Sequence, residues 1–264
     1  MMHVLAIVNQ KGGVGKTTTA VNLAASLALA GHPTLVIDAD PQANATRSLD
    51  RSGQDRRTLY DVLVHDDVAL ADVIVETAIQ GLWVAPSSPG LAGAEIELVD
   101  VPGREARLKR AIAALDPYFT FVLIDCPPSL GLLSVNALVA AQGVIVPVQC
   151  EYLSLEGLGH LNKTLQLVQA RINPGLQITG LLMTMFDPRT NLSTQVVEEV
   201  GKHFARERFT TVIPRSIRLG EAPSYGETIH QYAPNSPGAL AYQALAGELA
   251  QRLGVPAAGS PARV

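Results

Sequence analysis

Residues 4–19 read Val4-Leu5-Ala6-Ile7-Val8-Asn9-Gln10-Lys11-Gly12-Gly13-Val14-Gly15-Lys16-Thr17-Thr18-Thr19. An apolar run typical of a strand gives way to a glycine-rich turn, and Lys16 then opens a long segment with helical periodicity. The glycines let backbone N–H groups converge on an anion, and the helix adds the positive end of its dipole. The pattern predicts a strand, a phosphate-binding loop and a helix. Lys16 is expected at the β- and γ-phosphates, and the Thr17 hydroxyl at the accompanying magnesium.

The length and composition fit one α/β domain of the larger kind. With 264 residues, 47% of them hydrophobic, the chain can bury a sizeable core. Its net charge of −4 is not that of a nucleic-acid binder, so any contact with DNA has to come from a local patch. No signal peptide precedes the first strand, and no apolar run reaches the roughly 18 residues of a membrane span. We therefore expect a cytoplasmic protein.

Apolar strand segments alternate with helical segments along the whole chain. Strands are expected at residues 4–8, 34–37, 82–86, 119–125, 144–149 and 177–185. Helices are expected at residues 18–30, 91–99, 102–115, 132–141, 155–172 and 236–253, with short helical pieces at 58–64. This alternation predicts a doubly wound, mostly parallel sheet flanked by helices on both faces. We expect one domain over residues 1–254 and a disordered tail over residues 255–264, which are small and rich in proline.

Acidic side chains follow two of the predicted strands. Asp38 and Asp40 come after the strand at 34–37, and Asp125 ends the strand at 119–125. In doubly wound sheets, carboxylates at these strand ends face the ligand crevice. Asp125 has the Walker B form and is predicted to hold magnesium opposite Thr17. Asp38 and Asp40 are expected beside the phosphate site, and the alternative for both is capping of the next helix.

The glycine-rich loop departs from the ordinary P-loop pattern, because Gln10 stands at its first glycine position and Lys11 precedes the glycines. The sequence K-G-G-x-G-K-T resembles the deviant Walker A motif of the ParA/MinD family of ATPases, which implies a P-loop NTPase fold with ATP and Mg²⁺ as cofactors. In that family the extra lysine, here Lys11, reaches across a dimer interface to the partner's nucleotide. The residues implied to bind ATP are Lys11, Gly12, Gly13, Val14, Gly15, Lys16, Thr17 and Thr18.

Two further segments are similar to the switch regions of this family. They are residues 38–46, with the pattern D-x-D-P-Q-x-N-A-T, and residues 125–129, with the pattern D-x-P-P-S. The resemblance implies that Asp40 orients the attacking water and that Asp38 supports the metal site. Lys11, Lys16 and Asp40 are thus the candidate catalytic residues, and Thr17, Asp125 and Asp38 are the candidate magnesium residues.

The last third of the chain contains Thr211-Val212-Ile213-Pro214-Arg215-Ser216-Ile217-Arg218-Leu219-Gly220-Glu221-Ala222-Pro223-Ser224. This segment resembles one in Soj-type chromosomal members of the ParA family, in which arginines contact DNA phosphates without reading the sequence. Arg215 and Arg218 are therefore the candidate DNA-binding residues, and their spacing predicts that they share one face of a helical turn. The alternative is that they pair with Glu221 or Glu227 or are simply solvated.

The family resemblance extends from Asn9 to about Leu253 and implies a DNA-partitioning ATPase with slow intrinsic turnover. It further implies a homodimer that forms with ATP, binds double-stranded DNA of any sequence, associates with the nucleoid and is stimulated by a ParB-type partner. Two other functions of the same family stay open. Cys126 and Cys150 lack zinc-site or C-x-x-C spacing, yet two cysteines per chain could hold an iron–sulfur cluster in a dimer. A MinD-type positioning ATPase would need a basic amphipathic membrane helix, which the C-terminal residues lack.

Overall fold

The computed structural model describes residues 1–50, 52, 56–151 and 154–257. Over these residues, eight strands form one sheet in the order β3-β4-β2-β5-β1-β6-β7-β8. All neighbouring strands are parallel except β3, which runs antiparallel to β4 at one edge. The strands are β1 (His3–Ile7), β2 (Thr34–Asp38), β3 (Val75–Glu76), β4 (Leu82–Ala85), β5 (Phe121–Asp125), β6 (Gly143–Gln149), β7 (Gln177–Phe186) and β8 (Arg208–Pro214).

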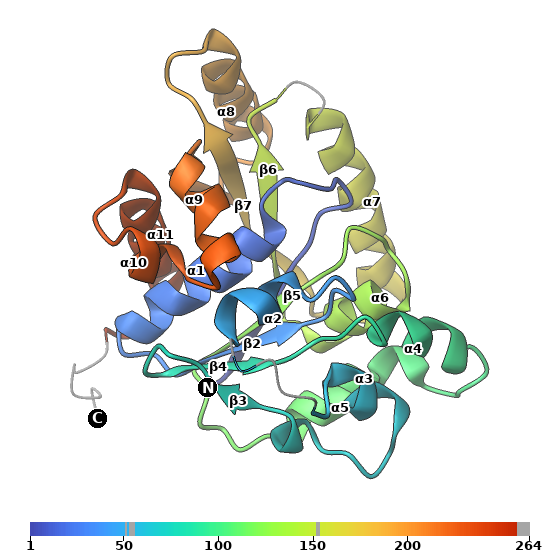
Figure 1. Cartoon of the computed structure of the whole chain (residues 1–264). Helices are drawn as coiled ribbons and strands as arrows, with labels where there is room; N and C mark the ends of the chain where they lie inside the picture. Colours follow the sequence, from blue (N-terminus) through green and yellow to red (C-terminus); the bar gives the residue numbers. More distant parts are fainter. Residues whose placement is uncertain (51, 53–55, 152–153, 258–264) are drawn as a thin grey trace.

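Helices cover both faces of this sheet (Figure 1). One face packs against α1 (Lys16–Leu29), α2 (Asn44–Leu49), α9 (Ile217–Glu221), α10 (Ile229–Tyr232) and α11 (Pro237–Arg252). The other face packs against α3 (Leu59–Val64), α4 (Leu91–Glu97), α5 (Arg107–Ala113), α6 (Leu132–Ala140), α7 (Ser154–Arg171) and α8 (Asn191–His203). Three short 3₁₀ turns complete the described elements, namely η1 (Leu70–Asp72), η2 (Arg104–Ala106) and η3 (Ala222–Tyr225).

The alternation of side chains along each strand explains why the core has two halves. In β1, Val4 and Ala6 join the cluster under α3 to α8, whereas Leu5 and Ile7 join the cluster under α1 and α11. Successive strand residues point to opposite faces, so a strand covered on both sides has to be apolar throughout. The predicted doubly wound, mostly parallel sheet is confirmed.

Several predicted boundaries need correction. The helix expected from residue 102 begins only at Arg107, because Gly103 adopts φ 68°, a left-handed conformation that cannot continue a helix. The edge strand β3 has two residues, too few to leave a sequence signal. Of the predicted tail, residues 258–264 lie outside the described residues. Before them, Val255 is held on the core by a 2.8 Å hydrogen bond from its N–H to the Ala250 carbonyl.

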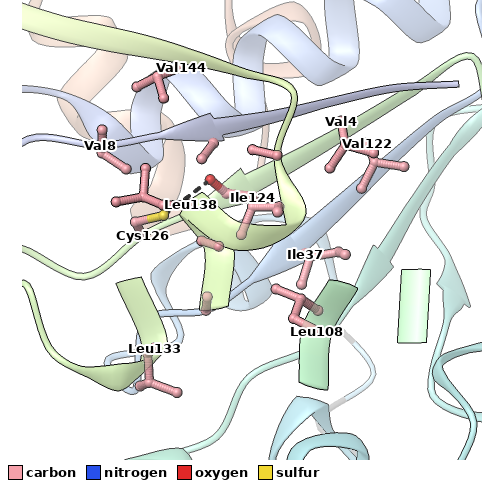
Figure 2. Packing of buried hydrophobic residues seen from close by; sticks show 14 of the residues in the cluster. Val4, Val8, Ile37, Leu108, Val122, Ile124, Cys126, Leu133, Leu138 and Val144 are labelled. Atoms are coloured by element: carbon pink, nitrogen blue, oxygen red, sulfur yellow. Dashed lines mark hydrogen bonds between the residues drawn. The ribbon is translucent and has the colours of Figure 1, made fainter. Parts of the chain in front are cut away.

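Cys126 lies inside the larger core cluster directly after β5. Figure 2 shows its thiol among the apolar side chains of this cluster, pointing to the Ile124 carbonyl oxygen at 3.7 Å. Cys150, which follows β6, belongs to the same cluster and is also buried. Burial raises the pKa of both thiols, that of Cys150 to about 12. An iron–sulfur cluster on a dimer axis needs cysteines at the surface, and both of these are packed in the core.

Candidate active site

The loop between β1 and α1 is held in place from two other strands. The Asn9 side-chain amide donates to the Pro147 carbonyl at 2.8 Å, and the Thr184 hydroxyl of β7 donates to the Val14 carbonyl at 2.9 Å. Gly13 and Gly15 adopt φ 74° and 91°, which residues with a Cβ rarely reach. Among the described residues, no side chain caps the N-terminus of α1, so its first N–H groups remain for a ligand. The loop therefore has the geometry of an anion-binding loop.

Lys16 starts α1 at the end of this loop. Its side chain is buried, with 7% exposed, and its Nζ donates to the Lys11 carbonyl at 3.3 Å. Burial lowers the pKa of Lys16, while the nearby Asp125 and Asp40 carboxylates act in the opposite direction. A buried ammonium requires a compensating anion. Its position at a helix N-terminus, below a glycine-rich loop, fits a phosphate.

The carboxyl ends of β2 and β5 bring Asp38 and Asp125 side by side, since these residues are register partners in the sheet. Asp125 is fully buried, and neither of its carboxylate oxygens meets a hydrogen-bond donor in good geometry among the described residues. Burial, reinforced by Asp38, raises the pKa of Asp125 well above its usual range, although the nearby Thr17 hydroxyl and Lys16 act against this rise. A buried carboxylate without donors fits a cation ligand.

A magnesium ion fits the neighbourhood of Thr17 and Asp125. Hard cations prefer oxygen ligands, and Mg²⁺ commonly takes one or two protein oxygens together with phosphate oxygens and waters. In the described part of the chain, no group of three or more His, Cys, Asp or Glu side chains is arranged to hold a metal by itself. The site is therefore suited to a metal that arrives with a phosphate ligand.

Asp38 uses both of its oxygens within the protein. Oδ1 accepts from the Asp40 N–H at 3.2 Å, and Oδ2 accepts from the N–H and the hydroxyl of Thr46, both at 2.7 Å. Burial raises the pKa of Asp38 to about 6 although these hydrogen bonds act against the rise. Thr46 lies in the first turn of α2, so Asp38 satisfies one N–H of that turn, although the N-cap of the helix is Ala43. Its contribution to the metal site stays a prediction.

Asp40 lies on the loop between β2 and α2 and is also buried. Its Oδ1 accepts from the Gln42 N–H at 2.9 Å, an Asx turn that fixes the carboxylate relative to its own backbone. Its charge acts on both Asp125 and Lys16. The structure therefore brings together five of the predicted residues at the carboxyl edge of the sheet, namely Asp38, Asp40, Asp125, Lys16 and Thr17. Their roles there stay predictions.

The chain is similar to known proteins over nearly its whole length. A family model described as an AAA domain matches residues 2–178. The sporulation initiation inhibitor protein Soj of Bacillus subtilis is 53% identical over 251 residues, 95% of this chain and 99% of that protein. The chromosome partitioning protein ParA of Myxococcus xanthus is 47% identical over 95% of this chain and 88% of that protein. The chain belongs to the Soj/ParA family.

A solved relative of the Soj/ParA fold carries ligands. Cobyrinic acid a,c-diamide synthase of Mycobacterium smegmatis, solved with a bound ATP analog and magnesium, is 39% identical to this chain with a TM-score of 0.83. The match covers 96% of each chain. In the described part of the present chain, no helix has the length and apolar character to cross a membrane.

Lys11, the lysine that distinguishes the Soj/ParA loop, pairs within its own chain. Its Nζ lies 3.4 Å from Oε2 of Glu151, and the two side chains are 38% and 45% exposed. Gln149 donates to Oε1 of the same carboxylate at 2.7 Å, and the Arg215 guanidinium lies 3.8 Å from it. Such an exposed ion pair stabilises by at most about 1 kcal/mol, so Lys11 can leave Glu151 at little cost. Sequence reasoning gave Glu151 no role, because the contact spans 140 residues.

The two candidate DNA-binding arginines of this Soj/ParA chain lie close in sequence but on different local structures. Arg215 precedes Ser216, the N-cap of α9, and its N–H donates to the Phe186 carbonyl at 2.9 Å. Arg218 lies within α9, so the prediction that both share a helical face is wrong. The Ser216 cap places the start of the helix between them. Both side chains are exposed, at 59% and 61%.

Arg218 is paired in this structure. Its Nη1 lies 3.3 Å from Oε2 of Glu221 and 3.4 Å from the Tyr232 hydroxyl, with the guanidinium 5.8 Å from the Tyr232 ring centre. Tyr232 in turn stacks on Tyr225 at 5.2 Å. The pairing with Glu221 is the alternative that the sequence left open. It is an exposed contact, weak enough to be exchanged for a phosphate.

Proposed function

We propose that the chain is an ATPase of DNA partitioning that binds ATP and Mg²⁺ and hydrolyses ATP slowly. The observation that supports this most directly is Asp125, a fully buried carboxylate with no donor in good geometry among the described residues, near the buried Lys16 at the N-terminus of α1. A cation would neutralise the Asp125 carboxylate, and an anion would neutralise the Lys16 ammonium. A magnesium-bound triphosphate supplies both, and the kinship to Soj and ParA makes partitioning the process it serves.

In the proposed mechanism each residue acts on charge or position. The loop from Lys11 to Thr18 and the Lys16 ammonium hold the phosphates, and Thr17 with Asp125 would hold Mg²⁺, which offsets negative charge on the phosphoryl group. Asp40 orients a water whose oxygen attacks the γ-phosphorus while the bond to the bridging oxygen breaks. ADP leaves, and the proton of the water passes to an oxygen of the released phosphate. Among the described residues we assign no strong general base to the site, so intrinsic turnover is expected to be slow.

The dimer and DNA steps follow from the surface residues. Lys11 leaves Glu151 and reaches the nucleotide of a second copy of the chain, so that ATP holds two subunits together. The dimer presents Arg215 and Arg218 to the phosphates of double-stranded DNA without reading its sequence. A ParB-type partner stimulates hydrolysis and releases the DNA. The protein is thus expected in the cytoplasm, associated with the nucleoid.

Gel filtration with ATP and Mg²⁺ tests the nucleotide cycle. Asp40→Ala should bind ATP and accumulate as a dimer, because closure is retained and hydrolysis is lost. Lys16→Ala should remain a monomer that binds ATP weakly. An Asp40→Ala protein that binds ATP with normal affinity and stays monomeric would count against the assignment.

A mobility shift on duplex DNA of arbitrary sequence tests the DNA step. The double variant Arg215→Ala, Arg218→Ala should lose the ATP-dependent shift and keep ATP-driven dimerisation. The salt dependence of binding should weaken by roughly 0.9 in logarithmic slope for each phosphate contact removed. Lys109→Ala, an exposed cation of α5 on the other face of the sheet, is the matched control. Unchanged DNA binding by the double variant would show that these arginines are misassigned.

A further inference from the structure

The backbone of Asp40 is hydrogen-bonded on both sides, once within its own turn and once from a distant segment. Its N–H donates to Oδ1 of Asp38 at 3.2 Å, and its carbonyl accepts from the Ser87 hydroxyl at 2.7 Å. Ser87 is 5% exposed and lies just after β4, the strand beside β2. A neighbouring strand therefore fixes the peptide that carries the Asp40 carboxylate.

The same serine closes a ring of hydrogen bonds. Its N–H donates to the Thr46 hydroxyl at 2.9 Å, and that hydroxyl donates to Oδ2 of Asp38 at 2.7 Å. The ring runs from Asp38 to Asp40, on to Ser87 and Thr46, and back to Asp38. It links the end of β2, the first turn of α2 and the loop after β4. Each polar atom in it has its partner, which makes the arrangement stiff.

We propose that Ser87 is a positioning residue for ATP hydrolysis: by holding the Asp40 carbonyl and the Thr46 hydroxyl together, it fixes the direction of the Asp40 carboxylate toward the attacking water. The inference rests on the proposed role of Asp40. Ser87 lies 47 residues from Asp40 and outside the D-x-D-P-Q-x-N-A-T segment. No part of that motif assigns it.

Geometry determines why a serine acts in this way. The Ser87 hydroxyl donates to the Asp40 carbonyl, and the Ser87 backbone N–H donates to the Thr46 hydroxyl. A single residue therefore sets the distance between Asp40 and Thr46. Ser87→Ala removes one of two donors from the Asp40 carbonyl, which keeps the local Ala43 N–H at 2.9 Å and loses its bond to the segment after β4. A displacement of about 1 Å in a positioning group can cost a hundredfold in rate. The phosphates are held by the separate loop at residues 11–18, so ATP affinity should change little.

Single-turnover ATP hydrolysis and ATP binding, measured side by side, test the proposal. Ser87→Ala should lower the hydrolysis rate by about tenfold to a hundredfold, with the Kd for Mg·ATP within about twofold of wild type. Thr46→Val, which keeps the shape and removes the bridging hydroxyl, should act similarly. The double variant should be no slower than the slower single variant, because both changes break one ring. Ser88→Ala is the control, since its hydroxyl faces Thr58 at 3.4 Å and should leave the rate unchanged.

Three outcomes would overturn the proposal: a wild-type rate in Ser87→Ala, a parallel loss of ATP affinity and rate in that variant, or additive losses in the double variant. If Ser87→Ala does not fold, Ser87→Cys replaces it, because a thiol keeps the size and donates only weakly. Asp40→Ala separates this inference from the proposed function. Wild-type hydrolysis by Asp40→Ala would overturn the role of Asp40 and the inference with it. An inactive Asp40→Ala beside a fully active Ser87→Ala would overturn the inference alone.

Discussion

Replacing Asp125 by asparagine should stabilise the ligand-free protein. The carboxylate is fully buried, lies in register with Asp38 and has no donor in good geometry among the described residues. Asn has nearly the same shape and no charge, and its amide can donate to Asp38. An unsatisfied buried polar group costs about 1–3 kcal/mol, and more when charged. Taking about 2 kcal/mol, and about 2–4 °C per kcal/mol for a chain of this size, the Tm of Asp125→Asn should rise by about 4–8 °C.

The gain should depend on pH in a defined direction. A carboxyl whose pKa is raised by folding stabilises the native state fully only below its unfolded pKa, about 4, and loses this contribution as the pH rises through the folded value. Burial raises the pKa of Asp125 well above its usual range. Wild type therefore loses stability toward neutral pH through this group, and Asp125→Asn does not. The Tm difference should be larger at pH 8 than at pH 5.

Calorimetry with and without Mg·ATP provides the assay. At 100 times Kd a ligand stabilises by about 2.7 kcal/mol, so the Tm of wild type should rise by roughly 5–10 °C, while Asp125→Asn should gain little. Asp67→Asn, in an exposed turn, controls for loss of an acidic charge and should leave both Tm values unchanged. A ligand-free Asp125→Asn protein that is less stable than wild type at pH 8, or equally shifted at both pH values, would refute the reasoning.

Two further substitutions test the residues that support the site. Thr184→Val removes the hydroxyl that donates to the Val14 carbonyl at 2.9 Å. The loss of one hydrogen bond of about 1.4 kcal/mol should weaken Mg·ATP binding by about tenfold. Titration calorimetry measures this affinity, and an unchanged value would show that the loop needs no support from β7. Gly180→Ala would place a methyl group in the buried Phe209 ring and should lower the free energy of unfolding by about 1–3 kcal/mol, whereas Gly247→Ala, in open space within α11, should not lower it in denaturant titrations.

The sequence was most informative where the chemistry is local. The glycines, Lys16 and Thr17 of the loop act within a few residues of one another, so their spacing alone predicts the anion-binding loop. The carboxylates could be assigned to one edge because strand direction in a parallel sheet determines where every strand ends. The structure agrees with both. Asp125 and Asp38 are register partners. This pairing depends on the order of the strands in the sheet, which cannot be read from the sequence pattern.

The missed features depend on contacts between distant segments. The pairing of Lys11 with Glu151 spans 140 residues, and the hydrogen bond of Ser87 to Asp40 spans 47. A serine or a glutamate at such positions resembles many exposed ones, and only the packing of adjacent strands reveals its partner. The prediction that Arg215 and Arg218 share a helical face was wrong for a different reason. Whether Arg215 shares a helix with Arg218 depends on the residue at which α9 begins, and helix boundaries are the least determined part of a sequence pattern.

The three acids of the site are stabilised unequally, and this inequality has a physical meaning. Asp38 is satisfied by Asp40 and Thr46, and Asp40 accepts from Gln42. Only Asp125 has no donor in good geometry among the described residues. Burial raises the pKa of both Asp38 and Asp125, but only at Asp38 do several hydrogen bonds oppose this rise. A cation at Asp125 would relieve its repulsion with the neighbouring Asp38. Because Asp38 accepts a hydrogen bond from the backbone of Asp40, binding of Mg·ATP should reduce the motion of Asp125 and of Asp40 together.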